Sequence, residues 1–264
     1  MNFETLKCSV DLKGIGRCVL QRPEVHNALN MQLIREMRQA LRGFAEMTEM
    51  RALVFTGSGK SFCAGGDLRW MQEMTNQDAS ERMKDAEELA LLLSELNRLP
   101  FLVVGRINGP AYGGGLGLIS CCDIAIGVES ATFSLSEVSL GLIPATISPY
   151  VVKRLGESNA RRVMLNAKRF SAKEAVQLGL LHQAVPDEDL DALVETEVNG
   201  VLRCAPEAVS ASKKLISEVD DRPAGEVLNE TIERLAQTWE TESCRQGIDA
   251  FLAKRKPPWI PEDH

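Results

Sequence analysis

The sequence predicts an α/β protein whose final third is helical, and two observations support this prediction. In the first half of the chain, short runs of apolar residues alternate with longer segments of helical spacing. This alternation is typical of parallel strands that helices cover on both faces. From residue 171 onward, the strand-like runs fade and helical patterns remain. At 264 residues, the chain is long enough for one large domain or two modest ones.

The expected strands are continuous apolar runs that end at turn signals. The clearest is residues 52–56 (ALVFT), which the turn Gly57-Ser58-Gly59 closes. The others cover residues 17–20, 101–104 and 123–126. Because these runs are apolar without alternation, we expect the strands to be buried on both faces.

The first expected helix covers residues 31–47. Ile34, Met37 and Leu41 recur there at helical spacing. Asn30 precedes them, and asparagine is a residue type that caps helix N-termini. The other expected helices cover residues 75–99, 172–178, 190–203, 206–218 and 224–254. No internal repeat or low-complexity linker separates these elements.

Composition argues against several classes of protein. The chain has 37 Asp and Glu residues and 30 Lys and Arg residues. The resulting formal net charge of −7 disfavours a general nucleic-acid binder. No apolar run approaches the roughly 20 residues that a membrane span needs. The N-terminal segment has no basic stretch followed by an apolar core, the pattern of a secretory signal. We therefore expect a cytoplasmic protein without nucleic-acid or membrane partners.

Seven cysteines and three histidines give no sign of a disulfide framework or a metal site. The cysteine count is odd, no two cysteines are spaced as CxxC, and Cys121 and Cys122 are adjacent in an apolar segment. The histidines His26, His182 and His264 are scattered along the chain. We expect no bound metal, and we interpret the cysteines as small core residues in a reducing compartment.

Three loops have compositions that suit a binding site. They cover residues 61–68 (SFCAGGDL), 108–118 (NGPAYGGGLGL) and 136–144 (SEVSLGLIP). Gly-rich turns from a strand into a helix expose free backbone N–H groups, which bind a phosphate or stabilise a developing oxyanion. Each loop alone is also compatible with a tight turn, but three such loops in this order favour a site.

A dinucleotide site is the weaker interpretation of the second loop. Gly113, Gly115 and Gly117 are spaced GxGxG, whereas the Rossmann fingerprint is GxGxxG. Glu137 lies 20 residues after Gly117, as a ribose ligand would, but it does not follow a clear strand end.

The segments FCAGGDL, NGPAYGGGLGL, CCDIAI and FSLSEVSLGLIP resemble the crotonase (enoyl-CoA hydratase/isomerase) superfamily, and the tail FLAKRKP resembles its C-terminal motif. The resemblance implies a crotonase-like β-β-α spiral core with a helical C-terminal region. Residues 1–195 would form the core with its CoA-thioester site, and residues 196–264 a helical oligomerisation region. It also implies homotrimers or dimers of trimers, acyl-CoA substrates, and no cofactor beyond the coenzyme A of the substrate.

Carried over by position, the resemblance assigns roles to named residues. The backbone N–H groups of Gly66 and Gly114 would form an oxyanion hole for the thioester carbonyl, and Glu137 would be the catalytic acid–base group. Phe251 and Lys254 would reach the adenine end of CoA from a neighbouring subunit. The phosphate-binding candidates are Arg22, Lys254 and Arg255. The implied substrate-binding residues are Val25, Ala28, Ala64, Asp67, Leu68, Tyr112, Gly113, Gly117, Pro144, Phe251 and Lys254.

One position departs from the family pattern. Typical hydratases carry a second glutamate where this sequence has Gly117. The segment around Glu137, with Ile147-Ser148-Pro149 after it, resembles the branch of the 3-methylglutaconyl-CoA and isohexenylglutaconyl-CoA hydratases, which implies a role in leucine degradation or fatty acid metabolism. We therefore expect a hydratase of a branched enoyl-CoA such as 3-methylglutaconyl-CoA. A double-bond isomerase that uses Glu137 and a non-catalytic acyl-CoA-binding scaffold remain alternatives.

Overall fold

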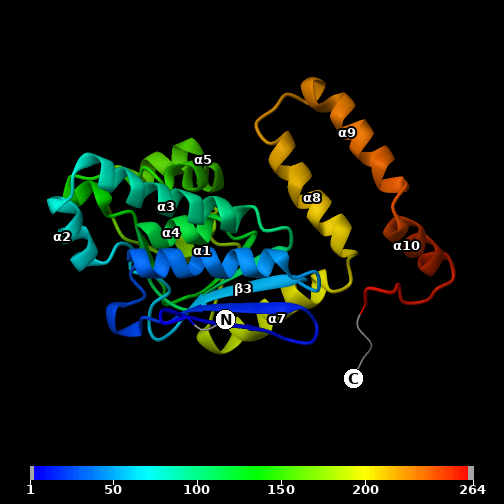
Figure 1. Ribbon diagram of the computed structural model, residues 1–264, viewed down its shortest axis with the longest axis horizontal. Helices are drawn as coiled ribbons and strands as arrows, with labels where there is room; N and C mark the ends of the chain where they lie inside the picture. Colours follow the sequence, from blue (N-terminus) through cyan, green and yellow to red (C-terminus); the bar gives the residue numbers. More distant parts are fainter. Residues whose placement is uncertain (1–2, 261–264) are drawn as a thin grey trace.

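The main sheet of the protein has six strands in the order β1-β2-β3-β4-β6-β9. The computed structural model describes residues 3–260 (Figure 1). β1 is antiparallel to β2, and each of the other neighbouring pairs is parallel. The strands are β1 (Leu6–Val10), β2 (Ile15–Leu20), β3 (Ala52–Gly57), β4 (Leu102–Ile107), β6 (Ile124–Val128) and β9 (Gln183–Val185).

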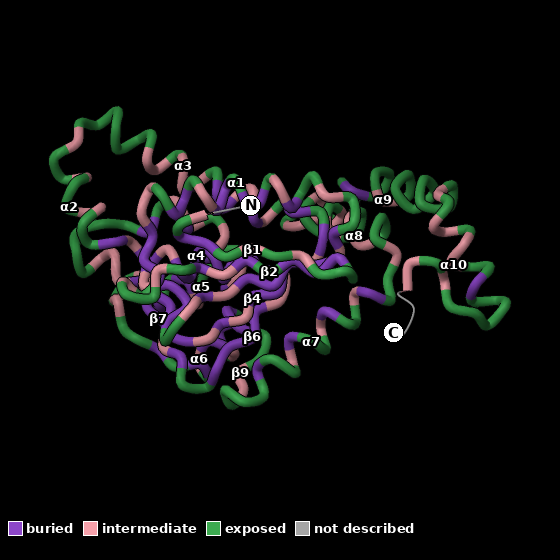
Figure 2. Tube along the Cα trace, turned by 60° about the horizontal axis from the view of Figure 1, so that its bottom comes forward, coloured by how far each residue is buried: buried purple, intermediate pink, exposed green. Residues whose placement is uncertain are grey.

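Helices cover both faces of this sheet. α1 (Met31–Glu46) packs against α3 (Ala79–Asn97) over one face, while α7 (Leu190–Val201) contacts β3, β4 and β6. Figure 1 shows α1 and α7 on opposite sides of β3, and Figure 2 shows buried residues along the central strands. The α/β prediction and the double-sided burial of the strands are confirmed.

A second sheet lies beside the first and holds β5 (Ala111–Tyr112), β7 (Thr132–Ser134) and β8 (Phe170–Ser171) in that order. α4 (Gly114–Ser120) begins directly after β5, and the short helix η2 (Glu137–Leu140) follows β7. Because β5 and β7 run parallel, the segments that leave them emerge at the same edge. At this edge, the Gly-rich loop of residues 108–118 and the loop of residues 136–144, which contains Glu137, come together.

Two long helices expected from the sequence are each divided in the structure. The segment 75–99 contributes the end of α2 (Leu68–Asn76) and the whole of α3, which Asp78 initiates through a capping box with Glu81. Thr241 likewise separates α9 (Ala224–Trp239) from α10 (Glu242–Leu252) by accepting the Cys244 N–H. These side-chain hydrogen bonds to the backbone begin a new helix without any break in the apolar pattern.

Other elements were absent from the expectation. β1 and α5 (Ser148–Met164) were not predicted, and β9 corrects the expectation that only helices follow residue 171. β9 has three residues and pairs with β6 at the edge of the sheet. So short a strand has too few residues for a periodic pattern.

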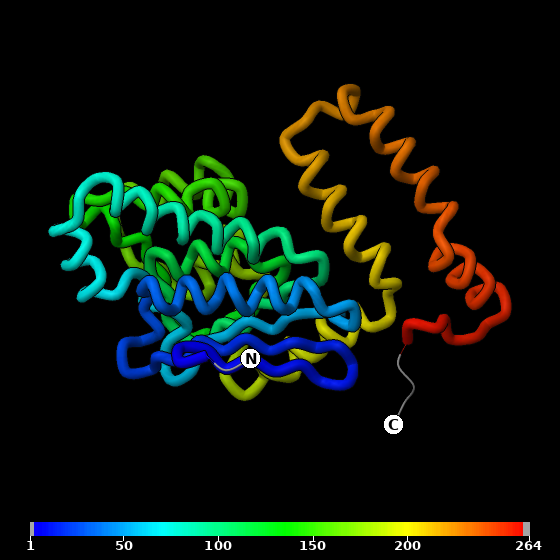
Figure 3. The backbone as a smooth tube through the Cα atoms, viewed as in Figure 1, coloured from blue at the N-terminus to red at the C-terminus, as the bar shows by residue number. Residues whose placement is uncertain are grey.

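The C-terminal helices stand apart from the core. α8 (Pro206–Val219), α9 and α10 extend away from the sheet (Figures 1 and 3). Lys213 of α8 ties them to the core, since its Nζ lies 2.6 Å from Asp123 Oδ2 and 3.1 Å from the Phe101 carbonyl oxygen. The expected division at residue 195 falls inside α7, and residues 261–264 lie outside the described residues.

Candidate active site

A series of backbone pairings gathers the three loops at one place. Ala111 pairs with Phe133 in the second sheet, and it also forms a parallel bridge with Cys63 of the first loop. Gly66, three residues after Cys63, forms a bridge with Leu29. Residues from four separated parts of the sequence are thus held side by side by main-chain hydrogen bonds.

The N–H groups of Gly66 and Gly114 are free in this arrangement. Neither donates a hydrogen bond to another described residue, although both lie at the partly exposed edge of the site. Leu29 holds them near each other, because its backbone bridges Gly66 and its Cδ1 lies 2.7 Å from where a Cβ on Gly114 would stand. Two unpaired N–H donors that both lie beside Leu29 can bind one oxygen atom.

The carboxyl group of Glu137 lies against the turn that leads into α4. Its Oε1 is 2.8 Å from the position that a Cβ on Gly113 would occupy, and Gly113 has φ +47°. Glycine is required here, since a side chain would be strained at this φ and would meet the carboxylate. Gly113 immediately precedes Gly114, so the Glu137 carboxyl lies against the residue next to the one that carries a free N–H.

Glu137 is half-buried and incompletely solvated. Its Oε2 is buried and has no hydrogen-bond partner among the described residues. Burial raises the pKa of Glu137 above its ordinary value, although its own backbone N–H acts in the opposite direction. A carboxyl group with a raised pKa exchanges protons more readily near neutral pH, which suits general acid–base chemistry.

The next turn of α4 is closed by apolar side chains. A Cβ at Gly117 would stand 2.4 Å from Ile147 Cγ2 and 3.5 Å from Leu93 Cδ2. Ile147 is only 2% exposed and Leu93 is fully buried. No side chain fits at position 117 while Ile147 keeps its place, so position 117 supplies no carboxylate to this side of the site.

Asp67 and Arg22 are engaged with each other. Arg22 Nη2 lies 2.8 Å from Asp67 Oδ2, and Arg22 Nη1 donates to the Ala28 carbonyl. Asp67 also caps α2 by accepting the Arg69 N–H at 2.9 Å. Burial alone would raise the pKa of Asp67, but the hydrogen bonds from Arg22 and the α2 N-terminus lower it. The pair fastens the Arg22–Ala28 loop to the first Gly-rich loop.

The remaining first-loop candidates lie along this fastened backbone. The Ala64 N–H donates to the His26 carbonyl at 3.0 Å, which sets Ala64 beside the loop of Val25 and Ala28. His26 adopts a left-handed φ of 54°, so the loop is held in a conformation that few L-residues adopt. Leu68, by contrast, is 79% exposed at the start of α2.

Tyr112 and Pro144 flank the site from the second and third loops. The Tyr112 hydroxyl lies 3.0 Å from Thr132 Oγ1, and the Arg169 guanidinium stands 5.4 Å above its ring. The Tyr112 side chain therefore has two partners, Thr132 and Arg169, within the same chain. Pro144 is buried in the segment that follows η2.

Phe251 and Lys254 lie far from Glu137 within one chain. Both are at the end of α10, and Phe251 is 81% exposed. Figures 1 and 2 place α10 at the opposite end of the molecule from α2 and β7. The described chain therefore does not bring these two predicted residues together with Glu137.

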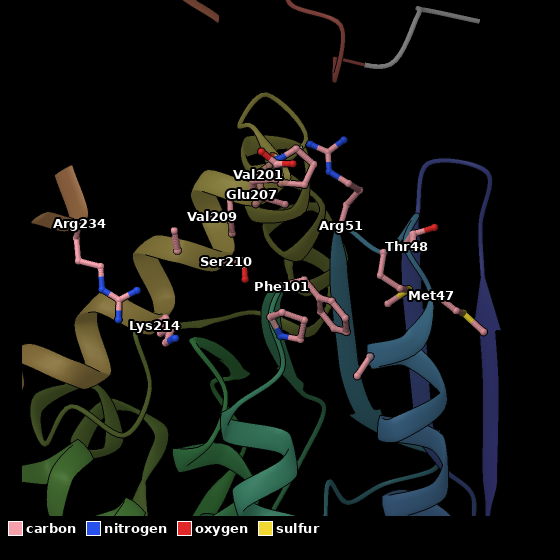
Figure 4. A pocket seen from close by; sticks show the side chains of 15 residues that line it. Met47, Thr48, Arg51, Phe101, Val201, Glu207, Val209, Ser210, Lys214 and Arg234 are labelled. Carbon is pink, nitrogen blue, oxygen red and sulfur yellow. Dashed lines mark hydrogen bonds between the residues drawn. The ribbon is translucent and has the colours of Figure 1, made fainter. Parts of the chain in front are cut away.

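A cavity of about 490 Å³ opens elsewhere, between the core and α8 (Figure 4). None of the expected site residues lines it. Its Arg51 donates to the carbonyl oxygens of Cys204 at 2.8 Å and Trp259 at 2.9 Å, so this cation joins the end of α7 to the C-terminal segment. The cavity is a groove between structural units, apart from the loop cluster around Glu137.

Comparisons of the sequence and of the overall fold with known proteins point to one family. The family model for enoyl-CoA hydratase/isomerase matches residues 12–262. The chain belongs to the enoyl-CoA hydratase/isomerase family. The crystal structure of an enoyl-CoA hydratase from Shewanella pealeana superposes with a TM-score of 0.94 at 40% identity, over 97% of this chain and 96% of that one. The helical C-terminal region expected for a crotonase-type enzyme is confirmed in the fold.

Two further proteins are similar to this chain. AtuE of Pseudomonas aeruginosa superposes with a TM-score of 0.93 at 35% identity, over 98% of this chain and all of that one. Enoyl-CoA hydratase ACTT6 of Alternaria alternata is 37% identical over 203 residues, which are 76% of this chain but 66% of that relative. The match therefore spans just under two thirds of that relative's length.

Sequence reasoning missed the residues that shape this crotonase-type site from behind. Leu29, Leu93 and Ile147 were not singled out for contact with the glycines, although Ile147 stood in a noted segment. Within residues 3–260, no group of three or more His, Cys, Asp and Glu could hold a metal ion. No helix in the same range is long and apolar enough to cross a membrane.

Proposed function

We propose that this protein adds water across the α,β double bond of a branched acyl-CoA thioester, with Glu137 as the acid–base group. The observation that supports this proposal is the placement of the Glu137 carboxyl against Gly113, beside the free N–H of Gly114. Leu29 holds a second free N–H, that of Gly66, near the first. An acid–base group next to two unpaired donors is what enolate chemistry needs.

In this proposal, the two N–H groups bind the thioester oxygen as negative charge develops on it. Removing one such donor generally costs about 3 kcal/mol of transition-state stabilisation. Glu137 removes a proton from water as the water oxygen bonds to the β-carbon, and it returns a proton to the α-carbon. Burial raises the pKa of Glu137, and a more basic carboxylate accepts a proton from water more readily.

We propose further that the substrate carries a distal carboxylate, as 3-methylglutaconyl-CoA and isohexenylglutaconyl-CoA do. Support comes from position 117, where Ile147 and Leu93 leave no room for a second protein carboxylate. The carboxylate of the substrate would then help order the attacking water. Such a substrate fits leucine degradation or related branched-chain and fatty acid metabolism.

The second candidate is double-bond isomerisation, and the same apolar wall favours it. Glu137 alone can carry a proton from one carbon of the substrate to another, and Ile147 excludes a second acid–base group. A wall without polar atoms also gives water no hydrogen-bond partner on that side. The two candidates therefore share the oxyanion site and Glu137 but differ in whether water enters.

We also propose that the chain works as a homotrimer or a dimer of trimers in the cytosol. α9 carries exposed Leu228, Ile232, Leu235 and Trp239, each more than half exposed and spaced for one helix face. An assembly that buries this face would also let Phe251 and Lys254 reach the CoA of a neighbouring subunit. The free thiols support a reducing compartment, and in this proposal CoA enters only as part of the substrate.

Product analysis tests the proposal. The protein is incubated separately with a 2-enoyl and a 3-enoyl thioester of the same glutaconyl skeleton, and 3-hydroxyacyl product is measured against double-bond migration. Hydration of the 2-enoyl thioester supports the proposal, whereas migration alone supports the isomerase. If methyl-esterifying the distal carboxylate leaves turnover unchanged, the role of that carboxylate is wrong. Binding of both thioesters without turnover would indicate a scaffold.

A further inference from the structure

Two thiols face each other on neighbouring strands, away from the candidate active site. Cys8 of β1 lies directly opposite Cys18 of β2 in the antiparallel ladder. The Asp11 N–H donates to the Ile15 carbonyl at 3.1 Å, and hydrogen-bonded pairs alternate from there along the strands. Cys8 and Cys18 therefore form a non-hydrogen-bonded pair, whose Cα atoms are about 4.5 Å apart. That separation lies within the range that a disulfide spans.

The side chains of this pair are already in contact. The two Sγ atoms are 3.9 Å apart and share a hydrogen bond. Cys18 is fully buried, whereas Cys8 is partly exposed on the edge strand. The hydrogen bond with Cys18 lowers the pKa of the Cys8 thiol, and the same bond together with burial raises the pKa of Cys18. Cys8 is thus the more acidic and the more accessible sulfur of the pair.

We propose that Cys8 and Cys18 form a redox modification site, at which hydrogen peroxide converts the two thiols into a cross-strand disulfide. The Cys8 thiolate attacks one peroxide oxygen, the O–O bond breaks, and Cys8 becomes a sulfenic acid as hydroxide leaves. The Cys18 sulfur then attacks the Cys8 sulfur and expels hydroxide. Protons from the two thiols convert both hydroxides to water, so one peroxide is reduced as two thiols are oxidised.

The other cysteines lack this combination. Cys63 and Cys122 are buried, and burial raises the pKa of each thiol to about 12. Cys204 is exposed, and within residues 3–260 its Sγ forms a hydrogen bond only with the Gly200 carbonyl. Cys204 should therefore oxidise without an intramolecular partner.

Peptide mapping of the full-length protein tests this site. The protein is treated with hydrogen peroxide, alkylated with iodoacetamide and digested with trypsin, which separates Cys8 from Cys18 by cutting after Lys13 and Arg17. The expected result is a linked pair of peptides containing Cys8 and Cys18, formed at a rate independent of protein concentration and released by dithiothreitol. Oxidation of Cys204 while Cys8 and Cys18 remain fully alkylated would overturn the proposal.

Variants identify the chemistry. In Cys8→Ser, the buried Cys18 should stay reduced under the same treatment, and in Cys204→Ser the Cys8–Cys18 link should form as in the wild type. Loss of the link in Cys204→Ser, or oxidation of Cys18 in Cys8→Ser, would contradict direct reaction at Cys8. Cys8 is partly exposed, so Cys8→Ser is expected to fold, which a thermal unfolding measurement checks.

Discussion

Two glycines one turn apart at the start of α4 meet opposite neighbours. Gly113 lies against the Glu137 carboxyl with a positive φ, whereas Gly117 has ordinary helical geometry and lies against Ile147. The first glycine leaves room for a charged group, and the second leaves room for close apolar packing. The position that lacks the second carboxylate is therefore not empty, because the buried side chain of Ile147 fills it.

The largest expected effect concerns the polar side of this comparison. Glu137→Gln keeps the size of the side chain but cannot exchange a proton, so turnover should fall by roughly 10²–10⁴-fold. Binding of a saturated acyl-CoA, measured by calorimetry, should change little. Glu129→Gln, on an exposed turn, is the matched control and should keep full turnover. Full activity of Glu137→Gln would remove Glu137 from the mechanism.

On the apolar side, we expect a substitution at Gly117 to lower stability and a second substitution at Ile147 to restore part of it. In Gly117→Ala the new methyl would stand 2.4 Å from Ile147 Cγ2, and such overpacking costs about 1–3 kcal/mol. Ile147→Ala removes that methyl, so the two substitutions together should be less destabilising than the sum of their separate effects. Urea unfolding of both single variants and the double variant measures the coupling.

A control separates the packing at position 117 from the general effect of alanine in a helix. Gly200 lies in α7 with open space around its Cα. Gly200→Ala should therefore be neutral or stabilising by up to about 1 kcal/mol. Gly117→Ala variants that match Gly200→Ala in stability would show that Ile147 does not close this position.

A smaller effect is expected from Ile147→Val. Valine keeps Cγ2, the atom nearest Gly117, and loses only the terminal methyl, which costs about 0.5–1.5 kcal/mol. Ile147→Val should leave turnover within about twofold, and it should not rescue Gly117→Ala. If Ile147→Val rescued the stability of Gly117→Ala as well as Ile147→Ala does, the steric conflict would not involve Ile147 Cγ2.

The sequence predicted the parts of the fold that periodic patterns determine. The apolar runs that became β2, β3, β4 and β6 were found, and so was α1 with Asn30 as its cap. The divisions at Asp78 and Thr241 were missed, because a single N-capping side chain begins a new helix within an unchanged apolar pattern. Short strands such as β9 were missed because three residues show no period.

The candidate site was predictable at its loops but not behind them. The composition of the three loops marks them as unusual, whereas the roles predicted for Gly66, Gly114 and Glu137 come from the family resemblance. The contact between Gly117 and Ile147 joins residues 30 apart in the chain through tertiary packing, which one sequence does not reveal. Arg22 looked in sequence like a phosphate ligand, but the structure pairs it with Asp67. A surface cation and a buried ion pair have the same sequence signature.

The smallest expected effect is a pH dependence of stability that only the polar side of α4 produces. Burial raises the pKa of Glu137 above its ordinary value of 4.5. Between the ordinary pKa and the raised pKa, the folded state binds more protons than the unfolded state, so the contribution of Glu137 to stability falls as pH rises. Glu137→Gln has no such group, so its stability relative to the wild type should increase across this interval and then level off. Urea unfolding from about pH 4 to about pH 8 measures the difference. Ile147→Val, which changes no charge, should differ from the wild type by a constant amount. A constant difference for Glu137→Gln as well would mean that the Glu137 carboxylate is as well solvated in the fold as in the unfolded chain.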